Sequence, residues 1–513
     1  TDVMPLGADG TRAMLLNASR LGDLIELCLD HLVRSPDIAD LIEAVDKPIL
    51  VTCRRSQDGG QWTGDETERL QLLRQAIVAE PEWIELDLDI AKKVPRYGRT
   101  KRVVAHTSLY ESLGATRSEI DSVFDAARDA DADVVKFTWP TPTLEAAWPL
   151  LSTVSQKRDL PVVGMGLGPC GLTFSLLGRK YGSPWIYAAL EHGMEAYEGQ
   201  PTVGDLDDIH RWRSISGSTR FIAVDGFDDG TLAMIGVFNQ AAESAGLDAR
   251  WLPLAWQDTS RLKQMFEKLK IQGVVGQPGG DAQLGELADR REAALGEDGP
   301  VDLLMHKDGG WQGFGCLWRA ALLALEEAIG GGDRPLDRRN VMVIGTGPLA
   351  RTMIFGASRR HGLVSVSGGD EQAAQQLASD TGARYVPAQN LYDTLVDVVV
   401  LADPALELGP GRGQLNPSFL RPPMLVTDVA AGREDSEALA ESRSRGCPVV
   451  EPETVWWGLA ESLFRSITGQ QLPSDICLLY TSDAADEERG VDLGGRRINK
   501  KKKGGGGGGG GGG

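Results

Sequence analysis

The chain has 513 residues, of which 42% are hydrophobic and 25% charged, proportions that are ordinary for a soluble folded protein. The net charge of −20 argues against a nucleic-acid-binding or anionic-membrane surface. There is no long apolar run and no signal-peptide pattern, and the six cysteines lack CxxC spacing, so we expect a cytoplasmic protein with reduced thiols and no metal centre. This length predicts two or three domains. We expect a small-molecule substrate, and an oligomer is possible.

The final segment, residues 477–513, reads differently from the rest of the chain. It runs CLLYTSDAADEERGVDLGGRRINKKKK and ends in ten glycines. This string resembles a translated sequencing adapter with a homopolymer tail. We expect it to be a disordered artefact and leave it out of the fold prediction.

The first 218 residues contain eight apolar, β-rich runs, most of them separated by helix-type segments. The first lies near Val3, and the others span residues 24–29, 49–53, 83–88, 103–107, 134–137, 162–165 and 185–190. Continuous apolar strands that alternate with helices indicate a parallel sheet covered by helices. Eight such units predict a (β/α)₈ TIM barrel, whose active site would lie at the carboxyl ends of the strands.

Lys136 closes the sixth of these runs, in the segment Asp133-Val134-Val135-Lys136-Phe137. A lysine at the end of a buried strand is desolvated, and its pKa falls, so its free amine can attack a carbonyl. The competing interpretation is a strand-end lysine whose amine reaches solvent. Other polar residues fall at the same predicted barrel end, which favours a site there: Glu26, Asp30, Arg54, Arg55, Asp58 and Gln200.

Several segments of this region, in order, resemble the type I 3-dehydroquinate dehydratases. They are DLIELCLDHL (23–32), KPILVTCRRSQDGGQWTGDETERLQLL (47–73), ADVVKF (132–137), VGMGLGPCG (163–171), KYGSPWIYAALEHG (180–193), the EGQ at 198–200 and DLDDIHRWRSI (205–215). The resemblance implies that Lys136 forms a Schiff base with a substrate ketone and that the barrel needs no cofactor. It also implies that Arg54 and Gln200 hold substrate and that Glu26 belongs to the supporting polar shell.

The chain departs from this family at several positions. Ser108 occupies the place of the catalytic histidine, and His106, two residues earlier, is the candidate replacement because strand alternation would put it on the same face. A buried structural histidine is the competing interpretation for His106. Asp58 stands where the family has a glutamate and is the third catalytic candidate. Two expected arginines and one serine are replaced, by Cys28, Ser175 and Ala196.

The second region, residues 219–330, resembles the substrate-binding lobe of the shikimate dehydrogenases. The run RFIAVDGFDDGTLAMIGVFNQAAESAGLDARWLPLAW (220–256) carries the resemblance, and EPETVWWGLAESLFRSITGQQLP (451–473) resembles the family's last helix. We expect residues 451–475 to complete this lobe. Leu232 and Met234 replace two substrate-binding serines, and the family's catalytic lysine would fall near Gly280. The chemistry of this region is therefore predicted to be missing.

Residues 331–450 predict a Rossmann lobe that binds NADP or NAD. The segment RNVMVIGTGPLARTM (339–353) reads as a strand, the turn Gly345-x-Gly347-x-x-Ala350, and a helix. The expected Asn-Arg-Thr signature for a 2′-phosphate is replaced by Gly368-Gly369-Asp370. Asp370 could hold a ribose hydroxyl, which would favour NAD, or it could be a solvated loop residue.

Taken together, the chain resembles the bifunctional dehydroquinate dehydratase–shikimate dehydrogenase fusions of aromatic amino-acid synthesis. The leading hypothesis is Schiff-base dehydration of 3-dehydroquinate to 3-dehydroshikimate through Lys136. The alternatives are a catalytically degenerate homologue that binds a metabolite or a partner, and a Schiff-base enzyme with a different carbonyl substrate.

Overall fold

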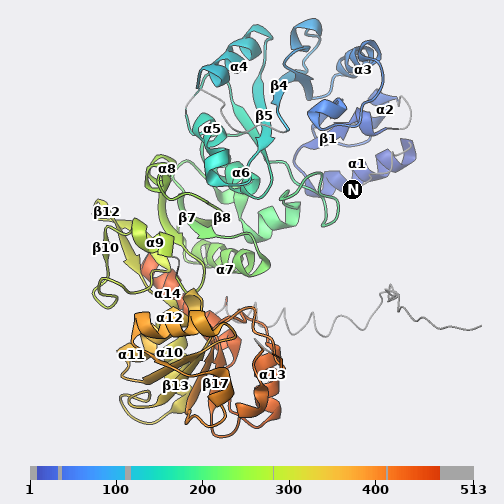
Figure 1. Ribbon diagram of the computed structural model, residues 1–513. Helices are drawn as coiled ribbons and strands as arrows, with labels where there is room; N and C mark the ends of the chain where they lie inside the picture. Colours follow the sequence, from blue (N-terminus) through green and yellow to red (C-terminus); the bar gives the residue numbers. More distant parts are fainter. Residues whose placement is uncertain are drawn as a thin grey trace, which may run out of the picture. The chain divides into compact units, whose positions relative to one another are not determined.

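The first sheet holds six parallel strands that lie side by side in chain order. A computed structural model describes residues 8–32, 37–109, 117–156, 158–280, 282–411, 414–473 and 476. The strands are β1 (Ile25–Cys28), β2 (Ile49–Thr52), β3 (Trp83–Asp87), β4 (Lys101–Thr107), β5 (Val134–Pro140) and β6 (Val162–Leu167). The helices of this region are α1 (Ala8–Leu21), α2 (Ile38–Glu43), α3 (Glu66–Val78), α4 (Arg117–Asp129), α5 (Leu144–Val154) and α6 (Cys170–Lys180) (Figure 1). Consecutive parallel pairing through helical crossovers is the arrangement of a (β/α)₈ barrel wall, and here every connection holds an α-helix except that from β3 to β4, which holds the 3₁₀ turn Ala91–Lys93.

Six of the eight predicted strands are confirmed, and the prediction of a strand at residues 185–190 is wrong. That segment forms a single bridge, between Ala189 and Thr202, instead of a ladder. Its aromatic side chains Trp185 and Tyr187 pack on an apolar cluster contributed by strands β2, β4, β5 and β6. The segment therefore fills the inside of the curved sheet without pairing with it. The predicted strand near Val3 lies outside the described residues.

The second sheet is mixed, with the order β10-β12-β11-β9-β7-β8. Its strands are β7 (Arg220–Asp225), β8 (Ala249–Leu254), β9 (Ile271–Val275), β10 (Arg290–Arg291), β11 (Leu303–Lys307) and β12 (Gly310–Phe314), and β11 is antiparallel to both β9 and β12. Its helices are α7 (Asp229–Ser244), α8 (Leu262–Leu269), α9 (Ala282–Leu287) and α10 (Leu317–Ile329). The last helix, α14 (Pro452–Thr468), returns to this region, where Phe464 stacks on Trp251 with ring centroids 5.8 Å apart.

The third sheet is parallel, with the order β15-β14-β13-β16-β17. The strands are β13 (Asn340–Ile344), β14 (Leu363–Ser367), β15 (Arg384–Tyr385), β16 (Val398–Leu401) and β17 (Leu425–Asp428). Helices α11 (Pro348–Arg359) and α12 (Glu371–Thr381) lie on one side of this sheet and α13 (Glu437–Ser444) on the other (Figure 1). Strand order reverses between β13 and β16, as in a doubly wound nucleotide-binding fold. The predicted α/β class, with a Rossmann lobe in the second half, is confirmed.

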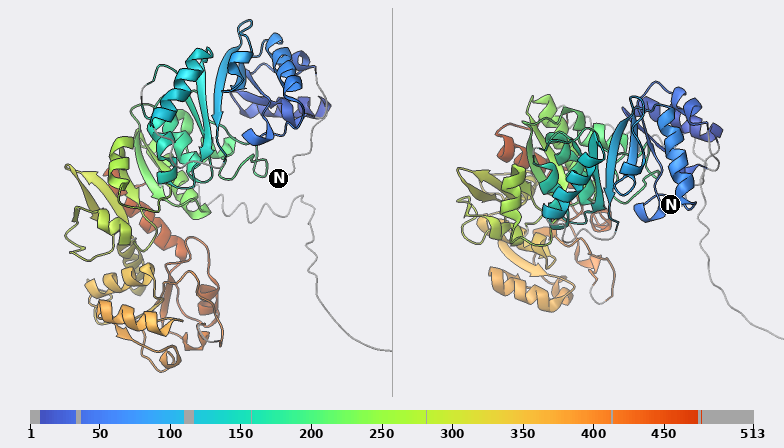
Figure 2. Two further views of the ribbon diagram at one scale, coloured as in Figure 1. Left: turned by 45° about the horizontal axis from the view of Figure 1, so that its top comes forward. Right: turned by 90° about the horizontal axis from the view of Figure 1, so that it is seen from above.

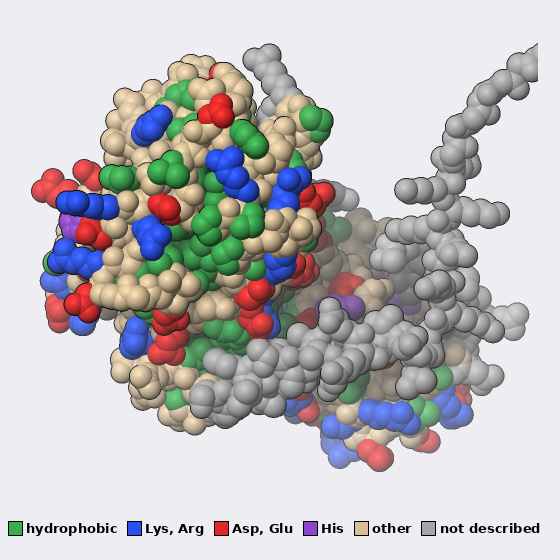
Figure 3. Space-filling view, turned by 90° about the horizontal axis from the view of Figure 1, so that it is seen from below, with side chains coloured by type: hydrophobic (Ala, Val, Ile, Leu, Met, Phe, Trp, Pro, Cys, Tyr) green, Lys and Arg blue, Asp and Glu red, His purple; other side chains and the backbone are tan. Residues whose placement is uncertain are grey.

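The three sheets fall within one compact unit, residues 1–472. Figure 2 shows the same elements from two other directions. Within the described part of the chain, no helix is long and apolar enough to cross a membrane. The molecular face in Figure 3 carries acidic and basic side chains interspersed with apolar ones. The boundaries at residues 218, 330 and 450, and the absence of a nucleic-acid partner, stay predictions.

Candidate active site

Lys136 lies inside the curved sheet, on strand β5, and is 1% exposed. Its register partners Ala105 on β4 and Val163 on β6 share its face of the sheet. Its Nζ donates to Oε2 of Glu85 on strand β3 at 2.9 Å. The phenol ring of Tyr187 covers the amine, with Nζ 4.6 Å from the ring centroid. The lysine is therefore held inside the barrel wall and does not extend to solvent.

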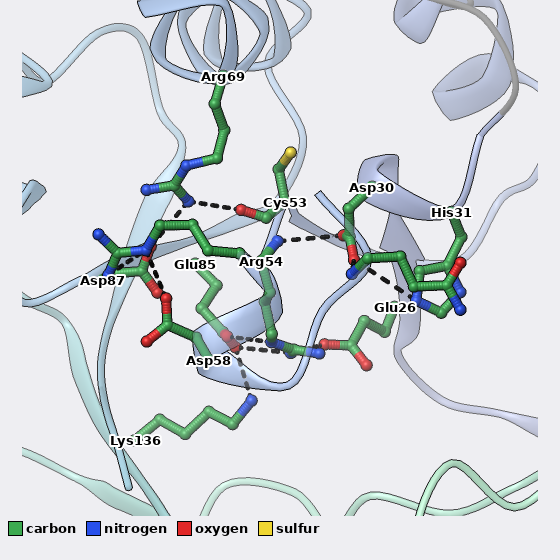
Figure 4. A network of polar contacts seen from close by, with 12 residues as sticks. Glu26, Asp30, His31, Cys53, Arg54, Asp58, Arg69, Glu85, Asp87 and Lys136 are labelled. Carbon is green, nitrogen blue, oxygen red and sulfur yellow. Dashed lines mark hydrogen bonds and ion pairs between the residues drawn. The ribbon is translucent and has the colours of Figure 1, made fainter. Parts of the chain in front are cut away.

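Glu85 is shared between two cations (Figure 4). Arg54, two residues beyond strand β2, donates from Nε to Glu85 Oε1 at 2.7 Å and also forms an ion pair with Glu26 of strand β1. The buried Lys136 and Glu85 and the half-buried Arg54 and Glu26 thus form one charge-balanced cluster. A buried charge is tolerated when it is paired and hydrogen-bonded in this way.

Burial and neighbouring charges shift the pKa values of this cluster. Burial lowers the pKa of Lys136, and the positive charge of Arg54 acts in the same direction, while Glu85 opposes it. Burial alone would raise the pKa of Glu85, but Arg54 and Lys136 outweigh it and lower that pKa to about 2. Glu85 therefore stays ionised, and Lys136 gives up its proton more readily than a free lysine, as a nucleophilic amine requires.

Asp58 lies in a neighbouring arm of the polar network (Figure 4). It ends the 3₁₀ turn Ser56–Asp58, and its Oδ2 accepts from Arg55 Nε at 2.5 Å. Arg55 in turn pairs with Asp89 at the rim, at 2.8 Å. Asp30 supports the same loop, because its carboxylate accepts from the backbone N–H of Arg54 and of Gln61. In this structure the contact of Asp58 is thus to Arg55.

Gln200 lies in a turn that meets the carboxyl end of strand β6. The backbone carbonyl of Glu198, in the same turn, accepts from Gly168 N at 3.1 Å, and Gly168 follows β6 directly. The side-chain Oε1 of Gln200 accepts from the backbone N–H of Ala196 at 2.7 Å. The turn therefore lies at the predicted active end of the barrel, with the Gln200 amide oxygen engaged inside the turn.

The prediction that His106 faces the imine site is wrong. The strand register aligns Lys136 with Ala105 and aligns His106 with Phe137, so His106 points to the other face of the sheet. There its ring makes an edge contact with Phe137, at a centroid distance of 6.0 Å, and Phe137 packs on Phe124 of helix α4. Side chains alternate between the two faces only within a strand, and Ser108 lies beyond the end of β4. The position of Ser108 therefore does not show which way His106 points.

Two residues of the site were missed by the sequence prediction. Glu85 sits in the apolar run Trp83-Ile84-Glu85-Leu86-Asp87, where a carboxylate on the inner face of a buried strand was a usable signal. Tyr187 lies in the segment predicted as a strand. Its hydroxyl is buried without a hydrogen-bond partner among the described residues, and burial together with Glu85 and Glu26 raises its pKa, so it is a neutral phenol.

The Rossmann turn keeps the backbone geometry of a dinucleotide site. Gly345 has φ +139°, and a Cβ there would lie 2.6 Å from the carbonyl oxygen of Ala402. Gly347 caps helix α11 and has open space where a Cβ would stand, while Ala350 is fully buried between helix and sheet. Asp370 follows strand β14, and its Oδ1 accepts from Ala373 N as the N-cap of helix α12. The turn therefore has the backbone geometry that a pyrophosphate needs, and the observed contact of Asp370 is the helix cap.

Comparison with known proteins agrees with both halves. Residues 3–216 match the family described as type I 3-dehydroquinase. The bifunctional 3-dehydroquinate dehydratase/shikimate dehydrogenase of Arabidopsis thaliana is 23% identical over an alignment of 501 residues that covers 92% of this chain and 82% of that protein. The 3-dehydroquinate dehydratase of Desulfotalea psychrophila is 27% identical over 36% of this chain and 85% of its own length. A solved structure, the dehydroquinate dehydratase and shikimate dehydrogenase from S. pombe AroM, is 16% identical with a TM-score of 0.42, covering 93% of this chain and 96% of that one.

The buried lysine on a parallel inner strand and the family match define the first half as a type I 3-dehydroquinase domain. The similarity to the Arabidopsis protein continues through the second half in the same order. As a whole, the chain is similar to the bifunctional 3-dehydroquinate dehydratase/shikimate dehydrogenase proteins, from which it diverges in sequence.

Proposed function

We propose that the first region dehydrates 3-dehydroquinate to 3-dehydroshikimate through an imine on Lys136. The observation that carries the proposal is the buried amine of Lys136, whose pKa is lowered and which is held between Glu85 and the ring of Tyr187. A free amine adds to the substrate ketone, and the resulting carbinolamine loses water to give the imine. Loss of a proton from the adjacent carbon gives an enamine, which expels the β-hydroxyl as a second water. Hydrolysis then releases the product and regenerates the amine.

The proposed roles of the other residues follow from their places around Lys136. Arg54 and Glu26 fix Glu85, and Glu85 fixes the amine. Because His106 faces away, we assign proton donation toward the departing hydroxyl to the phenol of Tyr187, whose raised pKa keeps it protonated. Gln200 would contact substrate after its turn rearranges, and Asp58 would hold Arg55 in the loop above the site.

The experiment is borohydride trapping with 3-dehydroquinate, followed by peptide mass spectrometry. We expect a reduced adduct on Lys136 and a matching dehydratase activity of the full chain. Folded protein without any adduct would contradict the proposal. An adduct on Lys136 without dehydration would point instead to a Schiff-base enzyme for another carbonyl compound.

For the second region we propose nucleotide binding at the turn of Gly345, Gly347 and Ala350, with NAD preferred over NADP. The nucleotide would supply hydride-transfer capacity when bound. Residues 367–370 (Ser-Gly-Gly-Asp) include no cation that could bind the 2′-phosphate of NADP, and the carboxylate of Asp370 repels that phosphate. Titration calorimetry should show that NAD binds more tightly than NADP. The Asp370→Asn variant should have a smaller difference between the two affinities. Tighter binding of NADP by the unmodified protein would contradict the assignment.

A further inference from the structure

Two aromatic rings of one irregular segment, those of Trp185 and Tyr187, pack together on the apolar cluster inside the first sheet. The segment is fixed on both sides of this pair. The hydroxyl of Ser183 donates to the carbonyl of Trp185 at 3.3 Å, and the backbone N–H of Ala189 donates to the carbonyl of Pro201 at 2.9 Å. The two rings therefore have fixed places against the sheet.

Strand β3 contacts this pair through two residues of its inner face. Trp83 and Glu85 are two positions apart, so their side chains point to the same side. The ring of Trp83 meets that of Trp185 edge-on, with centroids 5.1 Å apart. Glu85 accepts from the amine of Lys136, which the ring of Tyr187 covers (Figure 4). Trp185 thus lies toward the amino end of β3, and Tyr187 lies at the reacting amine.

Both rings carry a polar atom that is buried without a hydrogen-bond partner among the described residues. These atoms are Nε1 of Trp185, which can only donate, and the hydroxyl of Tyr187, which can donate and accept. Such atoms are rare in folded proteins, and a catalytic role is one of the established reasons for keeping them. The donor and the acceptor belong to neighbouring rings, so each can supply the contact that the other lacks.

The groups around Tyr187 decide how readily its phenol gives up a proton. Burial, Glu85 and Glu26 raise its pKa, while Arg54 and the indole of Trp185 lower it. Arg54 is already engaged in ion pairs with both carboxylates. Of the two groups that favour the phenolate, the indole N–H is therefore the one still available to the phenol oxygen.

We propose that Trp185 is a positioning residue for the elimination step, in which its indole N–H donates to the oxygen of Tyr187 as the phenol gives up its proton. This inference rests on the proposed dehydratase function. The enamine electron pair expels the β-hydroxyl, whose oxygen takes the proton of Tyr187 and leaves as water. The negative phenol oxygen then forms a charge-assisted hydrogen bond with Trp185. The proton lost earlier from the adjacent carbon balances the one that Tyr187 gives, and exchange with solvent restores the phenol.

The test compares Trp185→Phe with Trp139→Phe in the full-length chain. Trp139 is the matched control, because its Nε1 is also buried without a partner in the described part of the chain, while its ring contacts Phe137 on the face of β5 turned away from Lys136. For dehydration of 3-dehydroquinate we expect kcat to fall about tenfold in Trp185→Phe at little changed KM, and less than about twofold in Trp139→Phe. Borohydride trapping on Lys136 should persist in both variants. An unchanged kcat in folded Trp185→Phe would overturn the inference.

A double-mutant cycle shows whether Trp185 acts through Tyr187. In a Tyr187→Phe background, which has no phenol proton, Trp185→Phe should change kcat by less than about twofold. The same tenfold loss in both backgrounds would mean that Trp185 acts only through packing, and it would overturn the inference. An unmodified protein that forms no Lys136 adduct would refute the dehydratase proposal, and this inference with it. Circular dichroism establishes folding, and Trp185→Leu, which also lacks the N–H, takes the place of any Trp185→Phe protein that does not fold.

Discussion

Two carboxylates, Glu85 and Asp302, are buried to a similar degree in the two halves of this molecule, and their pKa values move in opposite directions. Glu85 lies between Arg54 and Lys136, and its pKa falls to about 2. Burial raises the pKa of Asp302 to about 6, although its backbone N–H partners act in the opposite direction. The depth of burial does not decide the charge of a site, because the nearest cation can outweigh desolvation.

The difference separates two kinds of site. In the first half, each buried charge already has its partner, so the cluster is pre-organised and its lysine can work as a nucleophile. In the second half, the buried carboxylate of Asp302 is held by the backbone N–H groups of Cys316 and Leu317, and its burial still raises its pKa. The first half thus holds a buried carboxylate between two cations, and the second half holds one that is bonded to backbone N–H groups.

The largest expected effect comes from Lys136→Met. Without the amine no imine can form, so we expect dehydratase turnover to fall by more than about 10³-fold and borohydride trapping to disappear. The matched control is Lys180→Met, because Lys180 is also buried, has a lowered pKa and donates to the carbonyl of Thr219 outside the site. Trapping that survives in folded Lys136→Met protein would place the imine on another lysine.

Glu85→Gln tests the charge balance of the first half. The change removes the carboxylate that pairs with the buried Lys136 and leaves the half-buried Arg54 with Glu26 alone, so we expect a loss of about 3–5 kcal/mol in unfolding free energy, measured by denaturant titration. Glu82→Gln removes an exposed pair with Lys101 and should cost less than about 1 kcal/mol.

The same variant sharpens the assignment of the amine. Glu85 favours the charged form of Lys136, so its removal lowers the lysine pKa further. The midpoint of the pH profile for trapping should therefore move to lower pH in Glu85→Gln. A midpoint that moves to higher pH, or does not move in folded protein, would contradict the role given to Glu85.

Asp302→Asn tests the second half through pH. The folded pKa of Asp302 is raised from its ordinary 3.8 to about 6, so the folded state holds this proton more tightly than the unfolded chain. Stability relative to the variant is therefore greatest below about pH 4 and declines as pH rises to about 6, a difference of about 3 kcal/mol. Denaturant titrations of both proteins at pH 4, 5, 6 and 7 measure it. A difference that is constant with pH would show that Asp302 is not shifted.

Much of the fold was predictable because its signals are local. Six apolar runs became strands, since continuous β-rich runs between helices indicate a parallel sheet. The run at residues 185–190 has the same composition, but strand formation needs a paired neighbour, and its aromatic side chains pack inward instead. Composition cannot report whether a partner strand is in reach.

The site was predictable in part for the same reason. Lys136 closes an apolar run and Arg54 directly follows one, so both could be recognised, although β5 continues beyond Lys136 to Pro140. The contact of Lys136 with Glu85 joins residues 51 positions apart. Asp302 and Asp428 are still further apart in the chain, since Asp302 directly precedes β11 of the second sheet and Asp428 ends β17 of the third, yet both line one pocket. No spacing rule in the sequence links such residues, so they can be recognised as neighbours only from the three-dimensional structure.

The smallest expected effect comes from His106→Phe. This variant tests whether His106 points away from the site, as the strand register shows, or acts as the catalytic histidine that the sequence resemblance suggested. His106 faces helix α4 beside Phe137, so an aromatic replacement should change turnover by less than about twofold and stability by about 1 kcal/mol or less. A histidine that shuttled protons at the imine would cost about 10²–10⁴-fold when removed. Tyr187→Phe is the paired variant, because it keeps the ring over Lys136 and removes only the proposed proton donor. A large loss in His106→Phe with none in Tyr187→Phe would reverse both assignments, and it would mean that strand β4 presents its other face to the substrate during turnover.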